Sequence, residues 1–345
     1  MNLRNYLSII LAGAMTISAL SCKKDDETTY KYLSGNLNFE VPGYVEPGAK
    51  VTMTASGVKH PEGEKLGYTW RVSPTMPKVD STDNPVFTHT FSDTLKTYTI
   101  YCTAYSKGYT SASATQVIQV VKGGLDQSIT GTGIKKNDAH ITYDGTDYYY
   151  TSINGTDWFR NNLAATNGGT PYRGFKAMND VLGRFYSYED AVKACPEGWR
   201  LPTDQDWIDM AKAFGAPASL EPHSQIPAMA AKIMANASYN GTLMWEYWPA
   251  VGEITNATGL SVIPVGYANL GAPAKNPEET KFNEGTYPGA YFNGANEYAV
   301  FWTADKVEGE EGMAYYRYII ANQPFISIEK GDTKTFGASV RCVRK

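Results

Sequence analysis

The chain has 345 residues, which is enough for two domains of ordinary size. Hydrophobic residues make up 42% and charged residues 19%, so the composition is that of a folded protein and not of a disordered or collagen-like one. The net charge is −4 and no basic stripe is present, so we expect no nucleic-acid partner. Aromatic residues reach 13%, including 25 Tyr and 7 Trp, which directs attention to binding surfaces.

The first 21 residues have the form of an export signal. Arg4 precedes an apolar run over residues 6–20, which is shorter than the roughly 20 residues that a membrane-spanning helix needs. The run ends at Leu20-Ser21-Cys22, which resembles the lipobox of bacterial lipoproteins, in which the cysteine is acylated and becomes the new N-terminus. An ordinary secretory signal that happens to contain a cysteine is the alternative.

Residues 22–30 then predict a charged tether. The run Lys-Lys-Asp-Asp-Glu at 23–27 cannot pack a core. A cysteine followed by a short acidic run resembles the surface-export signal of Bacteroidetes lipoproteins. That resemblance implies a protein held in the outer membrane by lipid on Cys22 and exposed on the cell surface. Several acyl chains on one cysteine would make the anchor stable.

Residues 31–122 are predicted to form short strands separated by turns. Apolar and polar residues alternate over residues 51–55, 68–72, 98–105 and 116–121. This pattern predicts an all-β sandwich, and it resembles PKD-type and other immunoglobulin-like (Ig-like) modules of bacterial surface proteins. We interpret Trp70 as a core residue in preference to a ligand-binding one, and Cys102 as a small buried hydrophobic residue. The domain is expected to hold the next one away from the membrane.

Residues 125–345 form the second predicted domain, after a boundary at Gly123-Gly124. Residues 149–158 predict a strand, a tight turn and another strand. Ser187 is expected to cap a short helix that reaches about Ala194, and Thr203 to cap a second helix closed at Gly215. A third, less regular helix is expected over 228–234.

The second helix predicts two contrasting faces. Its apolar residues recur with helical spacing at Trp207, Met210, Ala211 and Phe214. Its acidic residues, Asp204, Asp206 and Asp209, are interpreted as a solvated face, with the first two favoured by the helix dipole.

The second domain also carries a recognisable motif. Residues 194–207 read Ala-Cys-Pro-Glu-Gly-Trp-Arg-Leu-Pro-Thr-Asp-Gln-Asp-Trp, which resembles the central motif of the Fibrobacter succinogenes major paralogous (FISUMP) domain family. Other segments match the family in the same order along the chain. They are residues 153–158 and 162–163 before the central motif, and 255–259, 264–267, 301–303 and 339–343 after it. The Leu-Pro-Thr segment is similar to that of formylglycine-generating enzymes, which implies an α+β, C-type-lectin-like fold. Four tryptophans inside these motifs are expected to be structural: Trp158, Trp199, Trp207 and Trp302.

The cysteines fit this resemblance. With Cys22 lipidated and Cys102 in the first domain, Cys195 and Cys342 remain. An exported protein meets an oxidising compartment, and lectin-like folds pair a cysteine on an early helix with one on the last strand. The resemblance therefore implies a disulfide that closes a loop of about 147 residues and contributes about 4–5 kcal/mol in the chain-entropy model. Two free thiols are the alternative.

The catalytic relatives of this fold have requirements that the sequence does not meet. A copper-binding cysteine pair is not evident, and the second domain has only His140 and His223 as histidine ligands. No Ser-His-Asp order, P-loop or zinc spacing is present. We therefore expect no enzyme, no catalytic residues, no cofactor and no metal centre. The tripeptides Glu-Pro-Asn and Gln-Pro-Asp, which are typical of calcium-binding lectins, do not occur, so a calcium ion would need other ligands.

Two aromatic segments remain as candidate binding loops. The residues concerned are Trp245, Tyr247, Trp248, Tyr287, Tyr291 and Phe292. Sugars stack their C–H faces on such rings, while neighbouring polar side chains bind the hydroxyl groups. A place in the hydrophobic core is the alternative for each ring.

The sequence thus predicts a surface-anchored lipoprotein that captures extracellular polysaccharide without turning it over. A protein-binding adhesin or a structural cell-surface module is the alternative. A metal-dependent enzyme of the formylglycine-generating type is a third hypothesis.

Overall fold

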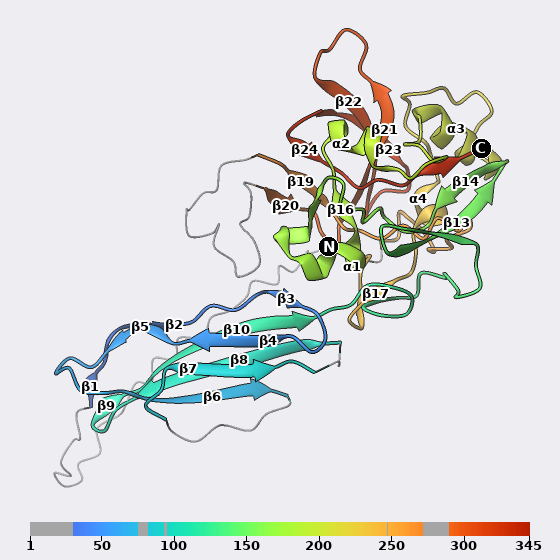
Figure 1. The fold of residues 1–345 in the computed structure, drawn as a ribbon. Helices are drawn as coiled ribbons and strands as arrows, with labels where there is room; N and C mark the ends of the chain where they lie inside the picture. Colours follow the sequence, from blue (N-terminus) through green and yellow to red (C-terminus); the bar gives the residue numbers. More distant parts are fainter. Residues whose placement is uncertain (1–29, 75–81, 93–94, 247, 272–289) are drawn as a thin grey trace, which may run out of the picture.

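The computed structural model describes residues 30–74, 82–92, 95–246, 248–271 and 290–345 (Figure 1). The structure is mostly β, with a few short helices, in agreement with the predicted β-rich class. Cys22 and the predicted signal segment lie outside the described residues. Within those residues, no helix is long and apolar enough to cross a membrane.

The N-terminal part, residues 30–122, forms short strands. They are β1 (Lys31–Tyr32), β2 (Ser34–Asn38), β3 (Tyr44–Val45), β4 (Lys50–Thr54), β5 (Ser56–Lys59), β6 (Gly67–Ser73), β7 (Val86–Thr90), β8 (Thr97–Tyr105), β9 (Tyr109–Thr110) and β10 (Ala112–Val120). One sheet has the order β3-β10-β8-β6, and β4-β7, β2-β5 and β1-β9 form separate pairs. Every second residue of β8 is buried, as the alternating sequence predicts.

Two aromatic contacts of Trp70 show how these strands pack against one another. Trp70, on β6, lies 1% exposed in the core. Its ring stacks on Phe87 of β7 at 5.3 Å and meets Phe39 edge-on at 5.0 Å. The interpretation of Trp70 as a core residue is therefore confirmed. Cys102 is a buried free thiol, as expected, and burial raises its pKa to about 12.

The C-terminal part, residues 125–345, interleaves short helices with small sheets. Its elements are β11 (Ile129–Thr130), β12 (His140–Tyr143), β13 (Thr146–Ile153), β14 (Thr156–Phe159), β15 (Thr170–Pro171), η1 (Tyr172–Gly174), η2 (Lys176–Met178), α1 (Asn179–Leu182), β16 (Arg184–Phe185), α2 (Tyr188–Ala194), α3 (Asp204–Ala213), α4 (Ala230–Ile233), β17 (Ser238–Tyr239), β18 (Thr242–Leu243), β19 (Tyr267–Asn269), β20 (Tyr291–Asn293), β21 (Tyr298–Lys306), β22 (Met313–Ile320), β23 (Ser327–Asp332), β24 (Phe336–Gly337) and β25 (Val343–Arg344).

Besides the β11-β17-β18 sheet and the β15-β16 pair, three antiparallel sheets organise this part of the chain. Their orders are β12-β13-β14-β25, β21-β22-β23 and β20-β19-β24. The predicted strand, turn and strand over 149–158 correspond to β13 and β14. Because β25 pairs with β14, the end of the chain returns to the first sheet of this part. The four motif tryptophans, Trp158, Trp199, Trp207 and Trp302, are buried as expected.

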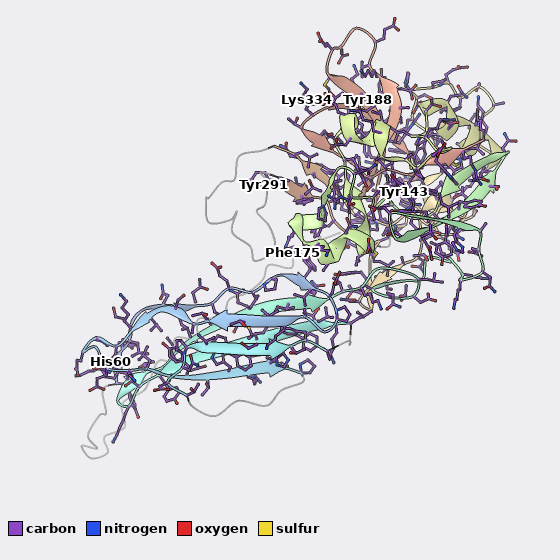
Figure 2. All side chains as sticks on the ribbon, viewed as in Figure 1. His60, Tyr143, Phe175, Tyr188, Tyr291 and Lys334 are labelled. Atoms are coloured by element: carbon purple, nitrogen blue, oxygen red, sulfur yellow. A yellow bond between two sulfur atoms is a disulfide. The ribbon has the colours of Figure 1, made fainter. Side chains whose placement is uncertain are left out.

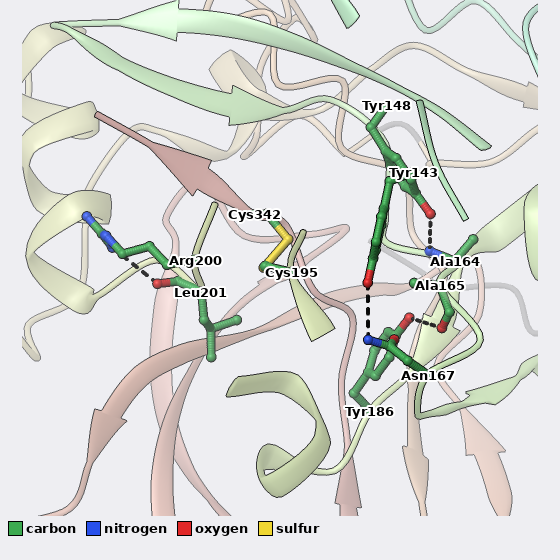
Figure 3. The surroundings of a disulfide bond; sticks show 10 residues. All are labelled: Tyr143, Tyr148, Ala164, Ala165, Asn167, Tyr186, Cys195, Arg200, Leu201 and Cys342. Carbon is green, nitrogen blue, oxygen red and sulfur yellow. Dashed lines mark hydrogen bonds between the residues drawn. A yellow bond between two sulfur atoms is a disulfide. The ribbon is translucent and has the colours of Figure 1, made fainter. Parts of the chain in front are cut away.

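The implied disulfide is confirmed. Cys195 follows directly after α2, and Cys342 directly precedes β25, with 5.8 Å between their Cα atoms (Figure 3). The surrounding core is aromatic, and its phenol groups are hydrogen-bonded: the Tyr148 hydroxyl accepts from the Ala164 amide at 3.0 Å. The bond therefore links a helix end to the last strand across a closed aromatic core.

Both capped helices are confirmed. Ser187 accepts a hydrogen bond from the Asp190 amide at the start of α2. Thr203 and Asp206 form a reciprocal capping box at the start of α3. The third helix is shorter than expected, because α4 comprises only Ala230–Ile233.

The interpretation of the acidic residues of α3 as a solvated face is wrong for two of the three. Asp204 is fully buried and accepts hydrogen bonds from Nε and Nη2 of Arg317, at 2.6 and 2.8 Å. Asp206 is also buried, and it accepts two hydrogen bonds from Arg200. Only Asp209 is partly exposed. The start of α3 is therefore held by ion pairs to other parts of the chain.

The N-terminal and C-terminal parts touch through aromatic rings. Tyr44 of β3 meets Phe175 at 5.3 Å and Tyr172 at 6.1 Å, both edge-on. Phe175 is labelled in Figure 2, on the side of the C-terminal part that faces the N-terminal strands. Burial raises the pKa of the Tyr44 phenol, in keeping with a contact that excludes water. Val121 joins the same hydrophobic cluster, so the chain enters the C-terminal part through a packed junction.

Candidate functional site

The first predicted binding loop is divided between core and surface. Trp245 is 1% exposed, and its indole Nε1 donates to the Val262 carbonyl at 3.0 Å. Trp245 is thus a core residue, and its assignment as a ligand-binding residue is wrong. Trp248 is 41% exposed, and Leu243 on the preceding strand β18 is exposed as well. Tyr247 lies outside the described residues.

The second predicted binding loop contributes one strand, β20. Phe292 packs edge-on against Phe185 at 5.2 Å and Tyr172 at 5.4 Å, so its ring stabilises the core between the sheets. Tyr291, labelled in Figure 2, is half-buried at the start of the same strand. Tyr287 lies outside the described residues. Among the predicted rings that the structure describes, Trp248 is therefore exposed, and Tyr291 and Phe292 are partly exposed.

A cavity of about 300 Å³ lies beneath the segment that follows β10. This volume is at the small end of the range found for ligand-binding pockets. The lining comes from residues 122–134, from the turn between β12 and β13, from the chain after β14, from α1 and its C-terminal glycine, from residues 261–263, and from Arg341 beside β25.

A glycine lets the segment after β10 form one wall of this cavity. A Cβ atom on Gly123 would lie 2.4 Å from both the Cβ atom and the carbonyl oxygen of Asp180 in α1. Side chains are therefore excluded from this point, and the backbone lies directly on the helix. Replacing Gly123 would force the two apart and open the cavity.

The floor of the cavity carries two buried arginines. Arg160, which follows β14, donates from Nη1 to Asp138 at 2.6 Å and from Nε to the Gly259 carbonyl at 2.7 Å. Its Nη2 donates to the Ser261 hydroxyl at 3.2 Å. The pKa of Asp138 is lowered, first by the Lys135 amide and then by Arg160.

Arg341 differs from Arg160 because its acceptors are neutral. It is 2% exposed, and its Nε donates to the Asn162 side-chain oxygen at 2.8 Å. Its Nη atoms donate to the carbonyls of Phe159, Leu260 and Ser261. Burial, with a smaller effect of Arg160, lowers the pKa of Arg341 to about 9. No carboxylate among the described residues forms an ion pair with it.

The rim of the cavity is polar and open to water. Asp126, Asp147 and Asp180 are exposed, and Lys122 adds one positive charge. The hydrophobic lining includes the largely buried Tyr149. In the described ranges, the rim included, no three His, Cys, Asp or Glu side chains are placed to hold a metal ion together.

Sequence reasoning missed this cavity, although one signal was available. Arg341 lies between Val340 and Cys342, in a run that is otherwise apolar. A charged residue at such a position predicts a buried charge that needs a partner. The partner segments cannot be read in the same way, since Arg160 and Ser261 lie about 180 and 80 residues away in the sequence.

One comparison places the chain among known proteins. The family model described as the Fibrobacter succinogenes major domain matches residues 151–344. No curated protein matches the chain. The matched range contains both floor arginines, whereas the rim residues from Lys122 to Asp147 precede it.

Proposed function

Since the chain belongs to the Fibrobacter succinogenes major domain family, we propose that it is a surface-anchored lipoprotein whose C-terminal domain captures extracellular glycan without turning it over. The cavity between the segment after β10 and α1 is the observation that carries this proposal. Its rim combines carboxylate, amide and hydroxyl groups, which both donate to and accept from sugar hydroxyls. The adjoining hydrophobic lining suits the C–H face of a sugar ring.

The N-terminal part is proposed to be an Ig-like sandwich that acts as a spacer. The β1–β9 pair, where the described chain begins, lies at one end of the strands, and β10 leads into the C-terminal part at the other (Figure 1). A nine-residue strand such as β10 spans about 30 Å. The cavity would thus stand away from a membrane anchor at the other end.

The C-terminal part is proposed to have a C-type-lectin-like fold. Three features support this assignment: two capped helices, α2 and α3; small antiparallel sheets; and a disulfide from the end of α2 to the last strand. Long irregular segments connect these elements, and such loops on a rigid scaffold commonly carry binding residues.

The anchor is proposed to be lipid on Cys22, in the outer membrane of a Bacteroidetes cell. Growth with labelled palmitate tests it directly. We expect label on the parent protein and none on Cys22→Ser. An unlabelled parent would show that the segment is an ordinary secretory signal.

Glycan capture is tested by affinity electrophoresis of the purified protein against a panel of polysaccharides. We expect retardation by at least one polymer, and a weaker effect for Asp147→Asn, which changes a rim carboxylate. The matched control is Glu308→Gln, which alters an exposed carboxylate on the loop after β21, outside the cavity lining. Retardation of the parent by none of the polymers would argue against glycan capture.

A protein partner is the second candidate, and one observation favours it. Leu243 and Trp248 are large apolar side chains exposed within a few residues of each other. Buried tryptophans often dominate the binding energy of protein interfaces. If Trp248→Ala removes binding to a surface protein while Asp147→Asn does not, the loop is the binding surface.

A further inference from the structure

Arg341 is a buried positive charge that lines the cavity, and no carboxylate in the described part of the chain pairs with it. The Arg341 guanidinium donates hydrogen bonds to the carbonyls of Leu260 and Ser261 and to the side-chain oxygen of Asn162. These bonds fix where the side chain lies, but neutral acceptors leave its charge uncompensated. Burying an unpaired charge is costly, so buried arginines normally meet a carboxylate or a bound anion.

The second arginine of the floor lies next to the first. Nη2 of Arg160 donates to the Ser261 hydroxyl at 3.2 Å, and Nη2 of Arg341 donates to the Ser261 carbonyl at 3.3 Å. Both guanidinium groups thus contact Ser261, one at its side chain and the other at its backbone carbonyl. Since Asp138 compensates one of them, the floor retains one net positive charge.

The carboxylates on the rim do not cancel this charge. Asp126, Asp147 and Asp180 are exposed, so water and salt screen them over about 8 Å at physiological ionic strength. The floor arginines are buried, where charges interact several times more strongly than in water. A ligand anion that reaches the floor therefore gains more from the arginines than it loses at the rim.

We propose that the cavity recognises an acidic sugar, with the ring hydroxyls at the carboxylate-lined rim and the sugar carboxylate on the Arg160–Arg341 floor. This inference rests on the proposed glycan capture and specifies its ligand class. The small volume admits a single or terminal sugar unit. Planar guanidinium groups pair well with carboxylates, which explains why arginines occupy this position.

The central comparison is between an acidic sugar and its neutral amide on the unaltered protein, so it does not depend on a variant that folds. Isothermal titration of the full chain measures binding of glucuronate, its neutral analogue glucuronamide, glucose and sodium sulfate. We expect glucuronate to bind at least tenfold more tightly than glucuronamide. Equal affinity for the acid and the amide overturns the charge preference but leaves glycan capture standing.

Two other outcomes separate the remaining possibilities. Sulfate that binds as tightly as glucuronate shows a simple anion site and overturns the sugar assignment. If none of the sugars binds and no polysaccharide retards the protein, the proposed function itself fails. In either case the measurement decides against the acidic-sugar site.

A variant of Arg341 then tests whether the sugar carboxylate binds at the floor of the cavity. Arg341→Gln keeps amide donors for the neighbouring carbonyls and removes the charge. We expect it to lose the preference for glucuronate over glucuronamide. Arg71→Gln, which removes an exposed arginine of the N-terminal part, serves as the control and should keep the preference. An unchanged preference in Arg341→Gln overturns the assignment of the floor.

Discussion

The ion pair between Asp204 and Arg317 gives a sharp prediction about stability. Both side chains have 0% exposure, and two hydrogen bonds of 2.6 and 2.8 Å join them. Arg317 also donates to the Ser224 carbonyl at 2.6 Å, and Asp204 accepts from the His223 amide at 2.6 Å. The pair therefore links β22, the start of α3 and the segment between α3 and α4. Arg317→Met removes one partner with little change in volume.

The expected effect follows from the charge that is left behind. With Arg317 gone, the Asp204 carboxylate stays buried with backbone donors only. Removing one partner of a buried pair costs about 3–5 kcal/mol of unfolding free energy. For a domain of about 200 residues, this corresponds to a fall of about 6–20 °C in the unfolding midpoint, measured by differential scanning calorimetry.

A second pair on the same helix supplies the matched control. Arg200 pairs with Asp206 at 2.6 Å, but its side chain is 44% exposed. After Arg200→Met the buried Asp206 carboxylate still accepts hydrogen bonds from the Thr203 amide and hydroxyl, and the Lys345 ammonium lies 3.7 Å away, so we expect a smaller loss than for Arg317→Met. If Arg317→Met costs no more than Arg200→Met, the reasoning from burial is refuted.

A double variant tests the mechanism. Adding Asp204→Asn to Arg317→Met removes the unpaired carboxylate, so the double variant should be more stable than Arg317→Met alone. A double variant that is less stable than the single one would show that lost packing, and not an unpaired charge, causes the effect.

Three further predictions concern other parts of the chain. Replacing Cys195 and Cys342 with Ala should lower the unfolding free energy by up to about 4–5 kcal/mol in urea titrations, and added reductant should then have no further effect. Gly123→Ala should weaken glycan retardation because its Cβ atom meets the α1 backbone at 2.4 Å, whereas Gly43→Ala, whose Cβ atom makes an ordinary 3.4 Å contact, should not. Because the Cys102 pKa is raised from 9.0 to about 12, the thiol should resist a maleimide at pH 8 until the protein unfolds. Between pH 9 and 12 the unfolded chain loses the Cys102 proton while the folded protein keeps it, so the unfolding free energy should fall as the pH rises through this range. Cys102→Ala should abolish this pH dependence.

Local signals in the sequence predicted the helices that carry their own caps. Ser187 and Thr203 specify the starts of α2 and α3 because their partners lie within three residues. The single turn α1 was not predicted, since no side chain caps it and its residues Val181 and Leu182 are buried by tertiary packing. Periodicity likewise showed which residues of α3 share a face, but not that Arg317, 113 residues away from Asp204, lies over one of them.

The candidate site was harder to predict because its residues also come from distant parts of the sequence. An aromatic cluster indicates either a core or a binding surface, and only the fold separates Trp245, hydrogen-bonded to Val262 in the core, from the exposed Trp248. The cavity floor joins Arg160 to Arg341 through Ser261, and no local pattern links these three positions.

Two of the three buried arginines in the described C-terminal part, Arg317 and Arg341, differ in their acceptors. Arg317 and Arg341 are 0% and 2% exposed, and each follows an apolar or aromatic residue within a strand or beside one. The fold compensates Arg317 with Asp204 in bidentate geometry, which shows that this chain can place a carboxylate against a buried guanidinium. At Arg341 the acceptors are carbonyls and an amide, although exposed carboxylates line the rim of the same cavity. A buried arginine with a purely structural role would be stabilised by a carboxylate partner, as Arg317 is by Asp204. Arg341 instead meets only neutral acceptors beside a cavity, which is consistent with the proposed carboxylate ligand.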